Sequence, residues 1–299
     1  MKKQLKGTVA ILVATIIWGS AFIAQSVGMD LIGPFTFQTI RCSMAVAFLT
    51  VVIFFFDLGK KDGKTYFSRW KDKRLWISGA ICGTALFIAA GLQQVGLVYT
   101  SAGKAGFITA MYIVLVPILG LFLKQRPPVT AWISVAIAVG GLYLLSCVGV
   151  SEVNIGDILV MGCALAYSVQ ITLIDRLAGG LDGIRLNCIQ NLFCALWSLP
   201  FMIGEEPVFA NIAACTIPLA YAGVMSMGVA YTLQIIGQQN LPPTPASLLM
   251  SLESVFAALC GWLILHERMT ATELFGCALV FAAVIISQLP VKEKKHATT

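Results

Sequence analysis

The sequence predicts an all-α polytopic membrane protein of ten transmembrane helices, arranged as two inverted five-helix repeats around a central cavity. Of its 299 residues, 58% are hydrophobic and 11% are charged, whereas an ordinary soluble domain has about 25% charged residues. The apolar runs are about 20 residues long, which is the length that crosses a hydrocarbon core as a helix. The third observation is a weak internal similarity between the two halves of the chain.

Ten apolar runs follow one another along the chain, separated by short polar segments. Because these runs are continuously apolar and do not alternate, they favour helices over a membrane β-barrel. Little chain remains for a soluble domain. The predicted spans are 8–27, 35–56, 75–96, 102–123, 129–147, 156–175, 184–203, 217–238, 246–265 and 272–289.

The lysines and arginines are distributed unevenly among the loops. If the amino terminus is cytoplasmic, 17 of the 20 basic residues fall in cytoplasmic segments and only Arg268 falls in an outer one. This asymmetry predicts an integral protein of the bacterial cytoplasmic membrane with both termini in the cytoplasm. The net charge of +6 then reflects topology, so the expected partners are the lipid bilayer and a small-molecule substrate, and no nucleic acid.

The internal similarity divides the chain into two expected domains, residues 1–148 and 149–299. Since each half has five spans, an odd number, the second half must enter the membrane from the opposite side. Inverted repeats of this kind place a binding site between the halves near the bilayer midplane. An offset of 149 residues aligns Gly7 with Gly156, Trp18 with Tyr167 and Arg41 with Gln190, and an offset of 142 later aligns 124–126 with 266–268.

Three charged residues lie within predicted spans: Arg41, Lys104 and Glu253. A charge at the bilayer centre costs roughly 2.5 to 3.5 kcal/mol, so such residues are functional candidates. Arg41 could hold a substrate carboxylate by paired hydrogen bonds, and Glu253 could bind an ammonium group or carry a coupling proton. The alternatives are a structural ion pair, a hydrogen bond to backbone and, for the shallower Lys104, snorkelling to the membrane surface.

Polar and aromatic side chains at helical spacing mark further inward faces. Amides that face lipid are unfavourable, so faces such as Asn187, Gln190 and Asn191 should point into the bundle. There they could bind a solute or form interhelical hydrogen bonds, the commoner use. The complete set of candidate substrate-binding or coupling residues is Trp18, Phe22, Gln25, Arg41, Gln94, Lys104, Tyr112, Tyr167, Gln170, Tyr231, Gln234 and Glu253.

Several motifs, in order along the whole chain, resemble the EamA-like family of the drug/metabolite transporter (DMT) superfamily. They are Trp18-Gly19-Ser20-Ala21-Phe22, Pro34 followed by Arg41, and the segments 99–117, 246–253 and 265–268. The resemblance implies a ten-helix bundle with a central cavity and the export or uptake of metabolites, amino acids or drugs. Val255 stands where the family often has proline, which favours a straighter ninth span. Gln125 replaces an acidic residue common in the first half.

Signatures of catalysis and nucleotide binding are absent from the sequence. Without a P-loop, transport would draw on a substrate or ion gradient, such as one of protons. The nine cysteines lack metal-type spacing, so we expect no metal, no cofactor and no enzyme activity. An intramembrane enzyme would need a nucleophile or paired acids at one depth.

The sequence therefore predicts a secondary transporter that exports small metabolites by alternating access. The expected solutes are amino acids, related amphipathic compounds or drugs. The alternative is a lipid-flipping or receptor-like membrane protein that does not transport solutes.

Overall fold

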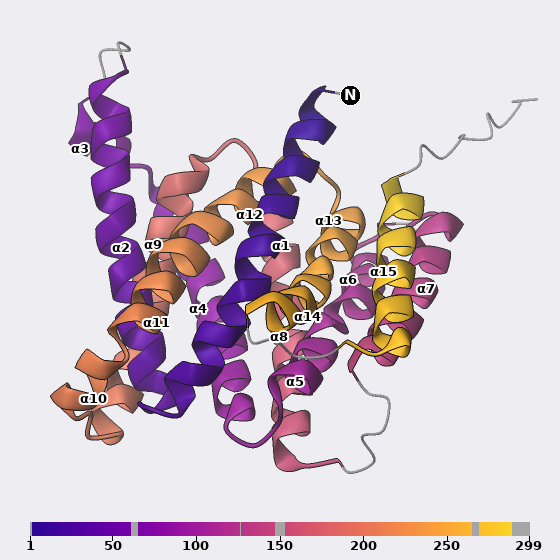
Figure 1. Ribbon diagram of the computed structural model, residues 1–299. Helices are drawn as coiled ribbons and strands as arrows, with labels where there is room; N and C mark the ends of the chain where they lie inside the picture. The colour runs from indigo at the N-terminus through magenta and orange to yellow at the C-terminus, as the bar shows by residue number, and fades with distance from the viewer. Residues whose placement is uncertain (1, 61–64, 126, 147–152, 265–268, 289–299) are drawn as a thin grey trace, which may run out of the picture.

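The computed structural model describes residues 2–60, 65–125, 127–146, 153–264 and 269–288. Within these ranges every regular element is a helix, and the helices form one bundle (Figure 1). The first described helix begins and the last one ends at the same end of the bundle (Figure 1). The motif 265–268, the expected span ends at 147, 265 and 289, and the boundary between 148 and 149 lie outside the described residues.

Polar caps and a proline start the helices of the first half. Pro34 occupies the first turn of α2, Asp72 caps α4 through the Arg74 amide, and Ser101 caps α5. These residues satisfy or remove backbone donors that have no partner in a first turn. The helices are α1 (Lys2–Met29), α2 (Pro34–Leu58), α3 (Tyr66–Arg69), α4 (Lys73–Leu97), α5 (Ala102–Ala110), α6 (Tyr112–Phe122) and α7 (Val129–Ser146).

The second half begins with a capping box, in which Asn154 and Asp157 each accept a hydrogen bond from the other's backbone amide. Asp182 caps α9 in the same way through two amides. The elements are α8 (Ile155–Leu177), α9 (Gly183–Gly204), α10 (Phe209–Ala214), α11 (Thr216–Ala220), the π-helix η1 (Tyr221–Ala230), α12 (Tyr231–Gln238), α13 (Pro243–Met250), α14 (Leu252–Ile264) and α15 (Ala271–Gln288).

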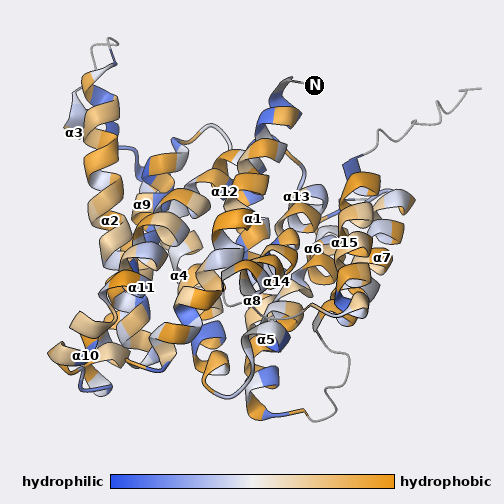
Figure 2. Ribbon diagram, in the orientation of Figure 1, coloured by the Kyte–Doolittle hydropathy of each residue, from blue (hydrophilic) through white to orange (hydrophobic). Residues whose placement is uncertain are grey.

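The membrane-length helices correspond to the predicted spans. In the described part of the chain, nine helical segments are long and apolar enough to cross a membrane, and Val129–Leu145 is a shorter apolar helix. Figure 2 shows hydrophobic residues along these helices, with hydrophilic residues mainly near their ends. Large side chains such as Phe122, Phe209 and Ile217 are more than 80% exposed, which requires lipid around the bundle. The protein is an integral membrane protein.

Three predicted spans are not regular α-helices. The fourth is interrupted at Met111 between α5 and α6, the ninth at Ser251 between α13 and α14, and the eighth contains η1. The expectation of a straighter ninth span was therefore wrong. The hydroxyl of Ser251 donates to the carbonyl oxygen of Leu248 (2.7 Å), a bond of the kind that often bends helices without any proline.

Helices of the two halves pair closely with one another. α2 packs against α9, α4 against α8, α1 against α12 and α14, and α7 against α15. Glycines allow three of these approaches, because a Cβ atom there would meet a carbonyl oxygen of the partner helix within 3 Å. The distances from such a Cβ to that oxygen are 2.9 Å for Gly7 against Gly237, 2.7 Å for Gly156 against Gly96 and 2.6 Å for Gly276 against Gly141.

The α2–α9 pair is joined at both of its ends. At one end, Arg185 near the start of α9 forms an ion pair with Asp57 near the end of α2. At the other, Glu205 at the end of α9 accepts hydrogen bonds from the Phe35 amide (2.9 Å) and the Thr36 amide (2.7 Å) at the start of α2. In each case an acid at the end of one helix holds the start of the other. Two repeats of opposite orientation would produce this reciprocity.

Candidate functional site

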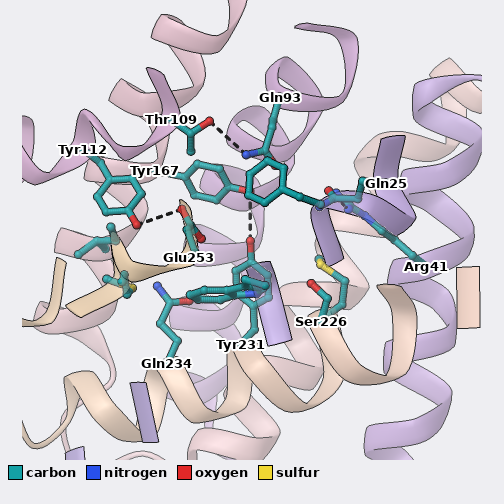
Figure 3. Close-up of a pocket in the computed structure, with 15 residues that line it drawn as sticks. Gln25, Arg41, Gln93, Thr109, Tyr112, Tyr167, Ser226, Tyr231, Gln234 and Glu253 are labelled. Atoms are coloured by element: carbon teal, nitrogen blue, oxygen red, sulfur yellow. Dashed lines mark hydrogen bonds between the residues drawn. The ribbon is translucent and has the colours of Figure 1, made fainter. Parts of the chain in front are cut away.

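A cavity of about 40 Å³ lies inside the bundle where the three irregular spans converge (Figure 3). Tyr112 follows the interruption at Met111, Glu253 follows the one at Ser251, and Ser226 belongs to η1. Broken and π-helical segments recur at functional sites in membrane proteins. The lining residues are Trp18, Phe22, Gln25, Arg41, Gln93, Thr109, Tyr112, Tyr167, Ile171, Ser226, Met227, Tyr231, Gln234, Met250 and Glu253.

Glu253 brings a carboxylate into this cavity from the first turn of α14. The interruption at Ser251 places the side chain at the positive end of a half-helix, which favours a negative charge. The residue is only 7% exposed, and the Tyr112 hydroxyl donates a hydrogen bond to its Oε1 (3.1 Å). Glu253 forms no ion pair with any residue that the structure describes. The cavity thus contains an acid without a cationic partner in those segments.

Arg41 brings a cation to the same cavity from the second turn of α2. It is 2% exposed, its Nη1 donates to Gln25 Oε1 (2.6 Å), and its guanidinium lies 5.4 Å from the Phe37 ring centroid. Its Nε is buried without a hydrogen-bond partner, and within the described ranges no carboxylate pairs with it. A guanidinium with spare donors in such a site can bind an anionic group.

Aromatic hydroxyls and rings form the wall next to these charges. The hydroxyls of Tyr167 and Tyr231 lie 3.1 Å apart, between Glu253 and Arg41 in the view of Figure 3. The ring of Trp18 packs edge to face on Tyr231, with centroids 5.0 Å apart. The cavity therefore combines two opposite charges with an amphipathic surface that suits a small solute with apolar and polar parts.

Nine of the predicted candidates line the cavity and three lie elsewhere. Gln94 is buried and donates to the Met29 sulfur (3.3 Å). Lys104 forms an ion pair with Asp157 (2.6 Å) at the start of α8. Gln170 lies behind the wall and accepts a hydrogen bond from Gln234 (3.4 Å). Those within the lining are Trp18, Phe22, Gln25, Arg41, Tyr112, Tyr167, Tyr231, Gln234 and Glu253.

Six further residues line the cavity that the sequence did not single out: Gln93, Thr109, Ile171, Ser226, Met227 and Met250. Gln93 could have been found from its neighbour Gln94, since both are amides in one apolar run. It donates a hydrogen bond to the Thr109 hydroxyl (3.3 Å). The remaining four sit in continuously apolar sequence, where the pattern does not indicate which side faces inward.

The inward amide face of α9 forms interhelical hydrogen bonds, the commoner of the two uses expected for it. The side-chain nitrogen of Asn187 lies 2.9 Å from the carbonyl oxygens of both Met227 and Gly228 in η1. Asn191 donates to the Met227 carbonyl as well (3.3 Å). This face therefore supports the cavity wall from behind.

Comparison with known proteins places this architecture in a family. The profile of the EamA-like transporter family matches residues 5–147 and again 154–289. An uncharacterized transporter from Archaeoglobus fulgidus is 32% identical over 290 residues, which cover 97% of this chain and 88% of that protein. The threonine/homoserine exporter RhtA of Escherichia coli (strain K12) is 31% identical over 181 residues, covering 58% of this chain and 59% of RhtA.

A solved crystal structure superposes on the same fold with a TM-score of 0.78. The match covers 94% of this chain and 96% of the other, at 16% sequence identity. At that identity the likeness concerns the fold alone. The two matches of the family profile span nearly the whole chain, and the chain therefore belongs to the EamA-like transporter family, a family of membrane transporters.

Proposed function

We propose that the protein is a secondary transporter that exports small zwitterionic metabolites of the amino-acid type through the central cavity by alternating access. The observation that carries the proposal is the presence of Arg41 and Glu253 in one cavity, each without an ion-pair partner among the described residues. The similarity to a threonine/homoserine exporter agrees with it. The orientation inferred from the basic residues places both termini in the cytoplasm of a bacterial cell.

Two opposite charges in one site match the two charges of a zwitterion. The substrate carboxylate would bind Arg41, whose Nε is unsatisfied, and the ammonium group would bind Glu253. Each buried charge then gains the partner that the described residues do not supply. Trp18 and the Tyr167–Tyr231 pair would contact the rest of the solute.

The size of the cavity bears on the transport cycle. About 40 Å³ is room for a few water molecules, so a solute can enter only when side chains or helices move apart. A closed site between two inverted halves is one state of an alternating-access cycle. The wider states would open the same residues to each side of the membrane in turn.

Glu253 also offers a way to couple export to a gradient. Protonation of its carboxylate and binding of an ammonium group exclude each other, because a neutral acid no longer attracts the cation. A proton that enters from outside would then release the substrate, and loss of that proton to the cytoplasm would restore the binding site.

The test is counterflow of radiolabelled L-threonine in proteoliposomes. We expect Glu253→Gln to lower the initial flux by about tenfold or more, as expected when a charged hydrogen-bonding partner of a buried ammonium is lost. Glu273→Gln is the matched control, since this exposed acid caps α15 outside the cavity, and its flux should remain unchanged. Equal flux in wild type and Glu253→Gln would contradict the proposal.

Lipid flipping is the second candidate function, and the same vesicles test it. A fluorescent phospholipid in the inner leaflet becomes accessible to a membrane-impermeant quencher when it is flipped. We expect no protein-dependent flipping, because Arg41 and Glu253 are 2% and 7% exposed and line an internal cavity. Flipping without solute flux would replace the transport proposal.

A further inference from the structure

The π-helix η1 forms one wall of the cavity. Ser226 and Met227 of η1 line it, and so does Tyr231, the residue directly after η1. In a π-helix each amide bonds to the carbonyl five residues earlier, so this segment fits more residues into each turn than an α-helix does. Such segments are rare and need local support, because part of the backbone loses its regular partners.

That support comes from α9. The Asn187 side chain is fully buried. Its Nδ2 lies 2.9 Å from the carbonyl oxygens of Met227 and Gly228 and 2.8 Å from the Thr232 hydroxyl. Its Oδ1 accepts hydrogen bonds from Gln190 and from Asn191, each at 2.8 Å. Asn187 is thus fixed by its own helix while its donors point at the backbone of η1.

The first half contains a counterpart without a π-helix. Gln38 lies 149 residues before Asn187, and its Nε2 donates to the carbonyl oxygen of Phe87 in α4 (3.3 Å). Phe87 lies 141 residues before Gly228, and α4 is a regular α-helix there. Neither Gln38 nor Phe87 lines the cavity. The same amide-to-carbonyl contact therefore occurs in both halves, but only in the second does its acceptor belong to the cavity wall.

We propose that Asn187 is a positioning residue of the transport site: it holds η1 in its π-helical form and so turns Ser226, Met227 and Tyr231 toward the cavity. Asn187 does not line the cavity, so it acts only through η1. The transport part of this inference rests on the proposed function. The conformational part does not.

The effect of removing Asn187 follows from the backbone. Without its Nδ2 donors, the carbonyls of Met227 and Gly228 lose partners in a buried place, at a cost that favours any arrangement that satisfies them. Return to α-helical hydrogen bonding is such an arrangement. Because fewer residues then complete each turn, the side chains before Tyr231 rotate about the helix axis and Ser226 leaves the cavity.

The test reads the direction of position 226 by its accessibility. Ser226→Cys is introduced into the full chain in proteoliposomes, treated with methyl methanethiolsulfonate, and modification at position 226 is measured by peptide-resolved mass spectrometry. We expect Asn187→Leu to slow this modification by about tenfold, since unsatisfied buried carbonyls bias the equilibrium by that order. Asn187→Gln keeps the amide donors, like Gln38 in the first half, and should restore the rate.

Gln38→Leu is the matched control, because it removes the equivalent contact to α4. We expect it to leave modification at position 226 unchanged. An unchanged rate in Asn187→Leu overturns the inference, and so does an equal decrease in Gln38→Leu, which would indicate general loosening. Absence of modification in the Ser226→Cys parent also overturns it. Should Asn187→Leu fail to purify as a monodisperse protein, Asn187→Ser decides in its place, with a smaller decrease expected.

Transport kinetics provide the second reading. We expect Asn187→Leu to raise the KM for L-threonine counterflow by about tenfold with a smaller change in maximal rate, because the wall that contacts the solute is displaced. A fall in maximal rate with unchanged KM would contradict a positioning role. If wild type carries no threonine, the proposed function fails, whereas the accessibility at position 226 still decides the inference about Asn187.

Discussion

The two halves of the chain share their supporting contacts. Gly7 of α1 approaches Gly237 of α12, and the related pair at offsets of 149 and 141, Gly156 and Gly96, joins α8 to α4. The start of α2 is held by an acid of α9, and the start of α9 by an acid of α2. These contacts are made mainly by glycines, backbone atoms and helix ends, so they depend on geometry more than on any particular solute.

The halves differ in the residues that face the cavity. Gln190 stands in the second half where the first has Arg41, and Met111 stands in the first where the second has Glu253. The regular α4 corresponds to the π-helical η1. Within the described segments, each half therefore supplies one charge, of opposite sign. This difference teaches that the repeat preserved the scaffold while the binding chemistry became asymmetric, as recognition of a solute with unlike ends requires.

The strongest test of the shared scaffold is the pair of contacts at the ends of α2 and α9. Arg185 is 3% exposed and pairs with Asp57 and with Asp182 (2.5 Å), so Arg185→Met should destabilise the protein by about 3 kcal/mol. Glu205→Gln weakens a cap and should cost about 1 to 2 kcal/mol. Thermal unfolding in detergent measures both.

An intermediate variant separates charge from geometry at this contact. Arg185→Lys keeps the positive charge but cannot bond Asp57 and Asp182 simultaneously through a planar guanidinium, so its loss should fall between wild type and Arg185→Met. If Glu205→Gln were the more damaging of the two substitutions, the ion pair would not be the stronger end of the α2–α9 pair.

The next prediction makes the first half chemically like the second. Arg41→Gln copies the residue at the equivalent position, Gln190, and removes the proposed carboxylate partner. Threonine counterflow should fall by about 10- to 100-fold, which corresponds to a lost charged hydrogen bond. The unfolding temperature should not fall, since a buried charge without a carboxylate partner in the described segments is removed.

Lys104→Gln is the complementary variant. Lys104 pairs with Asp157 away from the cavity, so its replacement should lower the unfolding temperature and leave the flux of the folded protein unchanged. A loss of flux in Lys104→Gln with normal stability would mean that the outer ion pair takes part in transport, and the contrast with Arg41 would fail.

Much of this architecture could be predicted because lipid penalises polar groups strongly. Long apolar runs indicate the spans, and the cost of an intramembrane charge points to Arg41 and Glu253 from the sequence alone. Helical spacing then places Trp18 and Gln25 on one inward face. These inferences need only local sequence and the energy of transfer into hydrocarbon.

The remaining details depend on contacts that local sequence does not contain. Gln93 and Gln94 are neighbours in a nearly uniform apolar helix, where no polar stripe fixes which of them faces the cavity. Lys104 pairs with Asp157, 53 residues away in the chain. The π-helical form of η1 depends on Asn187, which lies on another helix. In each case tertiary packing selects between arrangements that the sequence pattern leaves equivalent.

Glycine packing between α7 and α15 gives a smaller expected effect. A Cβ atom at Gly276 would lie 2.6 Å from the Gly141 carbonyl oxygen, whereas one at Gly140 would meet nothing within 4 Å. Gly276→Ala should destabilise the protein by about 1 to 3 kcal/mol through overpacking. Gly140→Ala, the control, should be neutral or stabilising by about 0.5 to 1 kcal/mol. Equal unfolding temperatures would show that the two helices tolerate wider separation.

The smallest expected effect concerns motion between the halves. Cys42 of α2 and Cys194 of α9 lie with their sulfurs 3.5 Å apart, so an oxidant should join them after a shift of about 1.5 Å. Because α2 and α9 are already held at both ends, we expect the cross-link to leave threonine flux unchanged, with Cys42→Ala as the control that cannot form it. Flux that stops on oxidation and returns on reduction would show that α2 and α9 separate during transport. Unchanged flux would mean that one helix from each half moves as a single body, so the cycle cannot be a simple rocking of one half against the other.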